Sequence, residues 1–327
     1  MTRVAVHACD CSDHVHQPGT VTVFSPAGVV PQAASARRAV RRLQALGFNA
    51  SLDESALARQ QRFAGDDDAR LATLHRVAAA APNVALATRG GYGLTRLLDR
   101  IDWALIRQSI ERGTAWVGYS DLTAFHLAAM AHKAAGPARV GHGVTAGLWA
   151  GPMACGDFGD AEQPDGGDDV TQACFVEAVT GLLEATGFRT EAGFDGLEAK
   201  GTLWGGNLSV LVSLLGTPHF PKVTDGILFL EDVNEHPYRI ERCLLQLKQA
   251  GVLDRQKAVL LGNFTGYRKS PLDRGYNLKT MVSYLREQTR TPILTGLPFG
   301  HVPVKVTMPV GRKVHLVVEG RDTLVLW

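Results

Sequence analysis

Hydrophobic positions follow two alternating periods along the first half of the chain. Short apolar runs with strand character occur at 20–25, 83–88, 115–119 and 138–141. Apolar residues recur at helical spacing in the stretches that follow them, at about 32–46, 67–80, 94–101 and 122–134. Alternating strands and helices predict a parallel sheet that is covered by helices on both faces. Such sheets bind ligands beyond the carboxyl ends of their strands.

A segment dense in glycine, proline and aspartate interrupts this pattern at 151–170, and such a composition is typical of a linker. Beyond it a helix begins near residue 172, and further helices are predicted at 238–250 and 278–287. Strands are predicted at 226–231, 258–262 and 314–318. The fold class is therefore α/β, with a smaller C-terminal α/β domain. The predicted parts are an N-terminal extension, an N-terminal domain, a linker and a C-terminal domain, at 1–19, 20–150, 151–171 and 172–327.

Length and composition agree with two folded domains. The 327 residues exceed the roughly 250–300 at which one core stops growing. A formal net charge of +2 lacks the basic excess of a nucleic-acid-binding protein. Five cysteines, an odd number, indicate a reducing compartment. No signal peptide is apparent, and no apolar run approaches the roughly 18 residues that span a membrane, so we expect a cytoplasmic protein.

The N-terminal extension contains a group of histidine and cysteine side chains that could bind zinc. Imidazole and thiolate are the usual zinc ligands, but their spacing here matches no structural zinc pattern. These side chains are His7, Cys9, Cys11, His14 and His16. We therefore expect a frayed extension and no metal site.

The stretch TAWVGYSDLTAFHLAAM (114–130) places Ser120 where an apolar strand turns into a helix. A serine at such a turn presents its hydroxyl at the sheet edge. The backbone N–H groups that follow can hold a developing oxyanion. The match to G-x-S-x-G is incomplete, because Leu122 replaces the second glycine. Taken alone, Ser120 is either a nucleophile or a helix N-cap.

A serine nucleophile needs a base, and the base needs an acid that orients it. Glu231 ends the strand predicted at 226–231, and His301 follows glycine in a predicted tight loop. Each has a plainer alternative: Glu231 can be a cap or a surface acid, and His301 can bond only to the backbone. The chain order Ser, acid, His is also that of α/β-hydrolases, although order alone proves little.

Two glycine-rich turns could contribute backbone or amide groups. RGGYG (89–93) follows a predicted strand, but it lacks a full dinucleotide or P-loop pattern. A second oxyanion N–H from Gly91, beside that of Asp121, suits this loop better. Asn207, in the Gly-Gly-Asn turn, can bind a peptide through its amide or simply start a helix.

Five motifs in order resemble the LD-carboxypeptidases, serine peptidases also called muramoyltetrapeptide carboxypeptidases. They are RGGYGLTRLLDRID (89–102), VGYSDLTAFHLA (117–128), GTLWGGNLSVLVSLLGTP (201–218), ILFLEDVNEHPYRIERCLLQLKQAG (227–251) and LPFGH (297–301). The resemblance covers roughly residues 20–311. The chain departs from the family pattern before residue 20 and in the segment HGVTAGLWAGPM (142–153).

The resemblance implies specific roles. Ser120 matches the nucleophile, His301 the base and Glu231 the acid, and Gly91 and Asp121 match the oxyanion donors. It also implies an N-terminal domain of the glutamine-amidotransferase-like kind and a homodimer. The implied reaction removes the terminal D-alanine of murein tetrapeptide during cell-wall recycling, without metal or cofactor.

Two alternatives stay open. A branch of the same family resembles self-immunity peptidases that cleave a peptide-like antibiotic carrying an acylated nucleotide; there Trp204 could stack on the base, or it could simply pack in the core. A non-catalytic peptide-binding protein could also use the same scaffold. Arg89 is a candidate to contact the terminal carboxylate of a substrate, or else it braces its loop through backbone carbonyls.

Overall fold

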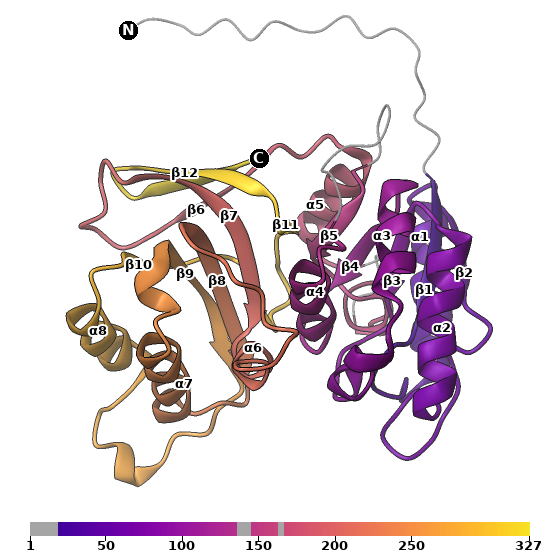
Figure 1. Ribbon diagram of the computed structural model, residues 1–327, viewed down its shortest axis with the longest axis horizontal. Coiled ribbons are helices and arrows are strands. Elements are labelled where there is room, and N and C mark those ends of the chain that lie inside the picture. The colour runs from indigo at the N-terminus through magenta and orange to yellow at the C-terminus, as the bar shows by residue number, and fades with distance from the viewer. Residues whose placement is uncertain (1–18, 136–144, 163–166) are drawn as a thin grey trace, which may run out of the picture.

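The computed structural model describes residues 19–135, 145–162 and 167–327. Within them the chain forms two sheets that lie beside each other, each covered by helices (Figure 1). The N-terminal half builds most of one sheet, and the C-terminal half builds the other. The predicted α/β class is confirmed.

The first sheet has the strand order β11-β5-β4-β3-β1-β2 among the described residues. Its strands are parallel except β11, which runs antiparallel to β5. The strands are β1 (Thr20–Phe24), β2 (Asn49–Leu52), β3 (Val84–Ala87), β4 (Ala115–Gly118), β5 (Gly147–Ala150) and β11 (Met308–Val310). The helices and turns are α1 (Ala33–Ala45), α2 (Asp67–Ala80), η1 (Leu94–Arg96), η2 (Leu98–Arg100), α3 (Trp103–Glu111) and α4 (Leu122–Ala131).

The predicted N-terminal elements mostly match this sheet, with three differences. The strand predicted at 138–141 lies outside the described residues, and β5 is the strand found next to β4. The helix predicted at 94–101 is two 3₁₀ turns, η1 and η2. The prediction also lacked β2 and α3. Strand β2 is only four residues long and half exposed at the sheet edge, so it carries little periodic signal.

The second sheet has the order β10-β9-β8-β7-β12-β13-β6 among the described residues. Strands β7 to β10 are parallel, and β12, β13 and β6 add an antiparallel part. Its strands are β6 (Ala185–Arg189), β7 (Glu198–Asn207), β8 (Gly226–Val233), β9 (Gln256–Thr265), β10 (Ile293–Thr295), β12 (Lys313–Glu319) and β13 (Asp322–Leu326). Its helices and turns are α6 (Leu208–Ser213), α7 (Pro237–Gln249), η4 (Leu253–Arg255), η5 (Pro271–Asp273) and α8 (Leu278–Gln288).

Several segments connect the two halves across the predicted domain boundary. Helix α5 (Asp169–Thr180) buries Phe175 in the core cluster beneath the first sheet, although the sequence places it with the second domain. Strand β11 returns from the C-terminal half to pair with β5 (Figure 1). The loop that ends at β11 is therefore held against the first sheet.

The segment after residue 150 has the composition of a linker, yet it packs firmly. It contains the π-helical turn η3 (Ala154–Phe158), whose Phe158 is buried and lies 5.2 Å from Phe175, centroid to centroid. Arg38 on α1 donates a hydrogen bond to the Gly159 carbonyl at 3.0 Å. Arg38 lies 121 positions upstream of Gly159, so local composition does not reveal this anchor.

His126 is a buried residue of helix α4. Its Nε2 donates to the Trp116 carbonyl at 3.2 Å, and burial lowers the pKa of His126 to about 4. Between about pH 6.5 and pH 4, His126 is therefore protonated in the unfolded chain and neutral in the folded chain. This contribution to stability is complete above pH 6.5 and is lost as the pH falls toward 4.

His126→Gln should remove this pH dependence. Between pH 7.5 and pH 4 the wild type should lose on the order of 3 kcal/mol of unfolding free energy relative to the variant, because one pKa unit corresponds to about 1.36 kcal/mol. Urea denaturation at a series of pH values measures the difference. Stability curves that run parallel for the two proteins would contradict the assigned cause.

Candidate active site

Ser120 lies at the turn between β4 and α4, at the carboxyl edge of the first sheet. Its φ of 61° lies in the left-handed region, which is strained for a residue with a side chain. The Ser120 carbonyl accepts the Thr123 N–H at 2.9 Å, so the turn leads directly into the helix. Leu122 packs over Gly118, where a Cβ would come within 2.7 Å of it. This is the geometry of a nucleophile elbow.

His301 and Glu231 form a hydrogen-bonded pair beside this turn. The Nδ1 of His301 lies 2.7 Å from Oε2 of Glu231. Glu231 is fully buried on β8, and His301 is partly exposed in the loop between β10 and β11. A buried carboxylate needs partners to offset its desolvation, and His301 supplies one. This arrangement matches the contact expected between a histidine base and an acid that orients it.

Asn207 is the second partner of Glu231. Its Nδ2 donates to Oε1 of Glu231 at 3.2 Å and to Oδ1 of Asp232 at 2.9 Å. The backbone N–H of Asn207 donates to Oγ1 of Thr123, on the helix that follows Ser120, at 3.0 Å. Asn207 thus connects Glu231 to helix α4, which follows Ser120.

The contributions of Thr123 and Asp232 were not predicted from the sequence. The contact between Asn207 and Glu231 follows from the pairing of β7 with β8, because these parallel strands place the two residues opposite each other. Recognising both strands as neighbours in the sequence could have predicted this contact. Asn207 also caps α6, where its Oδ1 accepts the Val210 N–H. The Asn207 amide therefore bonds to groups of the protein itself, and Asn207 also begins a helix, as the second alternative predicted.

The glycine-rich loop lies against the Ser120 turn. A Cβ on Gly90 would come within 2.6 Å of Ser120 Oγ and 3.1 Å of the Asp121 nitrogen. Gly91 has a φ of 104°, which favours glycine. In the described part of the chain neither Gly91 N–H nor Asp121 N–H donates to another group. Both N–H groups are therefore available as donors beside the Ser120 turn.

The side chain of Asp121 holds this loop in place. It accepts the Leu94 N–H at 2.9 Å. Burial, partly offset by the Leu94 hydrogen bond and the charge of Arg70, raises the pKa of Asp121 to about 6. The side chain is thus fixed to the loop while its backbone N–H stays next to Ser120.

Ser120 and His301 line one cavity of about 550 Å³ together with Gly90 and Gly91. Residues of α1 and of 153–162, including Met153, Cys155 and Gly156, also line this cavity. Arg89 also lines this cavity, and its Nη1 donates to the Val29 carbonyl at 2.9 Å. Arg89 therefore braces its loop and still faces the cavity.

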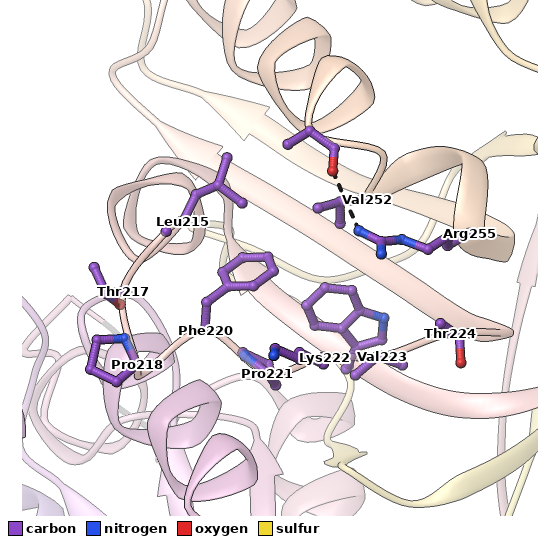
Figure 2. Close-up of a pocket in the computed structure, with 13 residues that line it drawn as sticks. Leu215, Thr217, Pro218, Phe220, Pro221, Lys222, Val223, Thr224, Val252 and Arg255 are labelled. Carbon is purple, nitrogen blue, oxygen red and sulfur yellow. Dashed lines mark hydrogen bonds between the residues drawn. The ribbon is translucent and has the colours of Figure 1, made fainter.

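Trp204 lies elsewhere. It is fully buried, and its Nε1 donates to Oε1 of Gln256 at 2.9 Å. It lines a separate cavity of about 730 Å³, around which Figure 2 shows Leu215, Phe220 and Val252. This position is that of a core indole, as in the packing alternative.

Within 19–135, 145–162 and 167–327, no cluster of three His, Cys, Asp or Glu side chains could hold a metal ion. The His and Cys residues of the N-terminal extension lie outside the described residues. In the same ranges, no helix combines the length and the apolar character needed to cross a membrane.

Comparison with known proteins defines the family. Sequence profiles of the LD-carboxypeptidase N-terminal and C-terminal domains match residues 21–137 and 200–316. The "Probable murein peptide carboxypeptidase" of Bacillus subtilis is 31% identical over 91% of this chain and 88% of its own length. The chain belongs to the LD-carboxypeptidase family. As such it is a carboxypeptidase of the serine type.

Other LD-carboxypeptidase relatives agree. The murein tetrapeptide carboxypeptidase of Pseudomonas aeruginosa is 28% identical and covers 94% of this chain and 96% of its own. The crystal structure of muramoyltetrapeptide carboxypeptidase from Oxalobacter formigenes has a TM-score of 0.82 at 35% identity, covering 94% and 97% of the two chains. The microcin C7 self-immunity protein MccF, solved with aspartyl sulfamoyl adenosine, has a TM-score of 0.78 at 20% identity over 94% and 96%. That likeness shows a shared fold.

Proposed function

We propose that the protein hydrolyses the LD-peptide bond of murein tetrapeptide and releases its terminal D-alanine. The observation that carries this proposal is the single cavity that contains both the strained Ser120 turn and the His301 ring, with His301 bonded to buried Glu231. The names of full-length relatives, the murein peptide and murein tetrapeptide carboxypeptidases, support the substrate.

In the proposed mechanism Ser120 Oγ attacks the scissile carbonyl while the His301 Nε2 accepts its proton. Glu231 fixes the Nδ1–H tautomer and stabilises the imidazolium. The N–H groups of Gly91 and Asp121 donate to the oxyanion. His301 then protonates the D-alanine amine as it leaves, and water resolves the acyl-enzyme by the reverse proton path. These steps use no metal and no cofactor.

Arg89 is proposed to contact the terminal carboxylate of the substrate. Its guanidinium lines the cavity beside Gly91, and only Nη1 is engaged by the Val29 carbonyl among the described residues. A planar guanidinium can brace one carbonyl and still bind a carboxylate. Asn207 and Trp204 do not line this cavity. A direct role in substrate binding therefore has no support from their positions.

The finer features that the family resemblance implies also belong to this proposal. They are a glutamine-amidotransferase-like first domain, a homodimer and a cytoplasmic location. Cys155, Cys174 and Cys243 are free thiols, which suits a reducing compartment.

Substrate comparison tests the proposal against its nearest alternative. Murein tetrapeptide should be turned over with a kcat/KM at least about 100-fold above that of an aminoacyl sulfamoyl adenylate, because no indole that could stack on a base is among the described residues that line the cavity beside Ser120. A tetrapeptide that ends in L-alanine is the matched control and should be a poor substrate. A preference for the adenylate would favour the self-immunity activity instead.

A further inference from the structure

Lys305 is a buried cation that the proposed mechanism does not use. Its side chain is only 1% exposed, and its Nζ forms an ion pair with the carboxylate of Asp157, which is 8% exposed. Removing two charges from water costs several kcal/mol per ion, which their attraction repays only in good geometry. The burial of this ion pair therefore needs an explanation, which its contacts with the segments around the active site provide.

The pair joins two segments that form the site. Lys305 belongs to the loop that carries His301, and the Val306 N–H closes this loop on the Pro298 carbonyl at 3.0 Å. Asp157 belongs to η3, whose Cys155 and Gly156 line the cavity, and its Oδ2 accepts the Met153 N–H at 2.7 Å. The ion pair thus ties the loop that carries His301 to η3, and so to residues that line the cavity.

A second anchor holds the same point of the loop. The backbone N–H of Lys305 donates to Oγ1 of Thr171 on α5 at 2.9 Å, and Thr171 donates in turn to the Pro303 carbonyl at 3.1 Å. The backbone of the loop is therefore fixed beside the side chain that forms the ion pair. Lys305 serves both contacts at once.

Tyr119 connects Lys305 to His301. The Nζ of Lys305 lies 5.5 Å from the centroid of the Tyr119 ring, a cation–π contact. The same ring packs edge-on against the imidazole of His301, with centroids 4.9 Å apart and planes at 64°. Tyr119 immediately precedes Ser120. Burial, and then the charges of Asp157 and Glu231, raise the pKa of Tyr119, which keeps the ring neutral.

These contacts supply a constraint that Glu231 alone cannot. One hydrogen bond from Nδ1 leaves the imidazole able to turn about the N···O axis. Packing against the Tyr119 ring fixes the plane of the imidazole and hence the direction of Nε2. A base misplaced by about 1 Å can lose on the order of 100-fold in rate.

We propose that Lys305 is a positioning residue for His301, acting through its ion pair with Asp157 and its contact with the Tyr119 ring. The proposal rests on the function proposed above. In this proposal the buried ion pair, which lies outside the triad, holds His301 in its productive orientation.

The test replaces the cation with a side chain of similar length. Lys305→Met should lower kcat by about 10- to 100-fold and leave KM within about twofold, because orientation is lost and the substrate-lining groups stay. The rate of labelling of Ser120 by a fluorophosphonate should fall in proportion. Asp157→Asn should act in the same direction, and the double variant should lose little more than either single variant.

Control variants separate positioning from stability. Gln256 is a buried polar side chain remote from the cavity, which bonds to Trp204, Val223 and Val252. Gln256→Met should lower the Tm without changing kcat per folded molecule. Tyr119→Leu removes the ring and should reproduce the kcat loss, whereas Tyr119→Phe keeps the ring and should lose much less. If Lys305→Met does not fold, Asp157→Asn and Tyr119→Leu test the same claim.

The outcomes distinguish this proposal from the proposed function. A wild-type kcat in Lys305→Met or Asp157→Asn, together with a lowered Tm, would overturn the positioning role and leave the triad intact. Failure of the wild-type protein to release D-alanine from murein tetrapeptide would overturn the proposed function itself, whatever Lys305 does. A rise in KM with unchanged kcat would also contradict positioning of the base.

Discussion

Ser120→Ala and His301→Ala should each reduce turnover of murein tetrapeptide by about 10⁴- to 10⁶-fold. The two side chains act as one unit, in which the serine is nucleophilic only while the imidazole accepts its proton. The double variant should therefore lose little more than either single variant. Single-turnover release of D-alanine, with KM measured in parallel, gives the comparison.

Glu231→Gln belongs to the same series and should cost less than either. The amide keeps part of the hydrogen bond to His301 but no longer stabilises the imidazolium. Circular dichroism and urea denaturation confirm that each variant is folded before rates are compared. Losses that multiply in the double variant would show that Ser120 and His301 act independently, and the triad would then be wrong.

Gly90→Ala should lower kcat by about 100-fold or more while the protein stays folded. The added Cβ would lie 2.6 Å from Ser120 Oγ and 3.1 Å from the Asp121 nitrogen, so the nucleophile or the oxyanion donor must shift. Gly90 does not have a positive φ, so alanine fits its backbone conformation. The expected loss is therefore one of geometry at the site.

Gly156→Ala is the matched control for this variant. Gly156 lines the same cavity, has no positive φ, and a Cβ there would meet nothing within 4 Å. Its kcat and KM should stay within about twofold of wild type. Equal losses in the two variants, or a wild-type rate in Gly90→Ala, would contradict the placement of Gly90 against the nucleophile.

The parts of the site that the sequence predicts are those tied to regular elements. Ser120 follows an apolar strand and opens a helix, and Glu231 ends a continuous apolar run, so periodicity alone places both near the carboxyl ends of strands, although β8 continues to Val233. His301 lies in an irregular loop, where no period specifies direction. Its pairing with Glu231 depends on the loop between β10 and β11, whose course is set by long-range contacts.

The segments that local sequence described poorly are held by distant groups. The 151–162 segment is poor in large apolar residues, yet Arg38 on α1 holds it through the Gly159 carbonyl, 121 positions away. The same reason explains Lys305, whose partner Asp157 lies 148 positions away. The indole of Trp204 was compatible with stacking or packing until its neighbours, including Gln256, were placed.

Covalent labelling tests the central claim most directly. A fluorophosphonate should modify one serine only, which peptide mapping should identify as Ser120, and loss of D-alanine release should follow the extent of labelling. Ser120→Ala should take up no label although it stays folded, because only a serine activated by His301 reacts readily. Label on another residue, or full hydrolysis of murein tetrapeptide by a protein labelled at Ser120, would contradict the account.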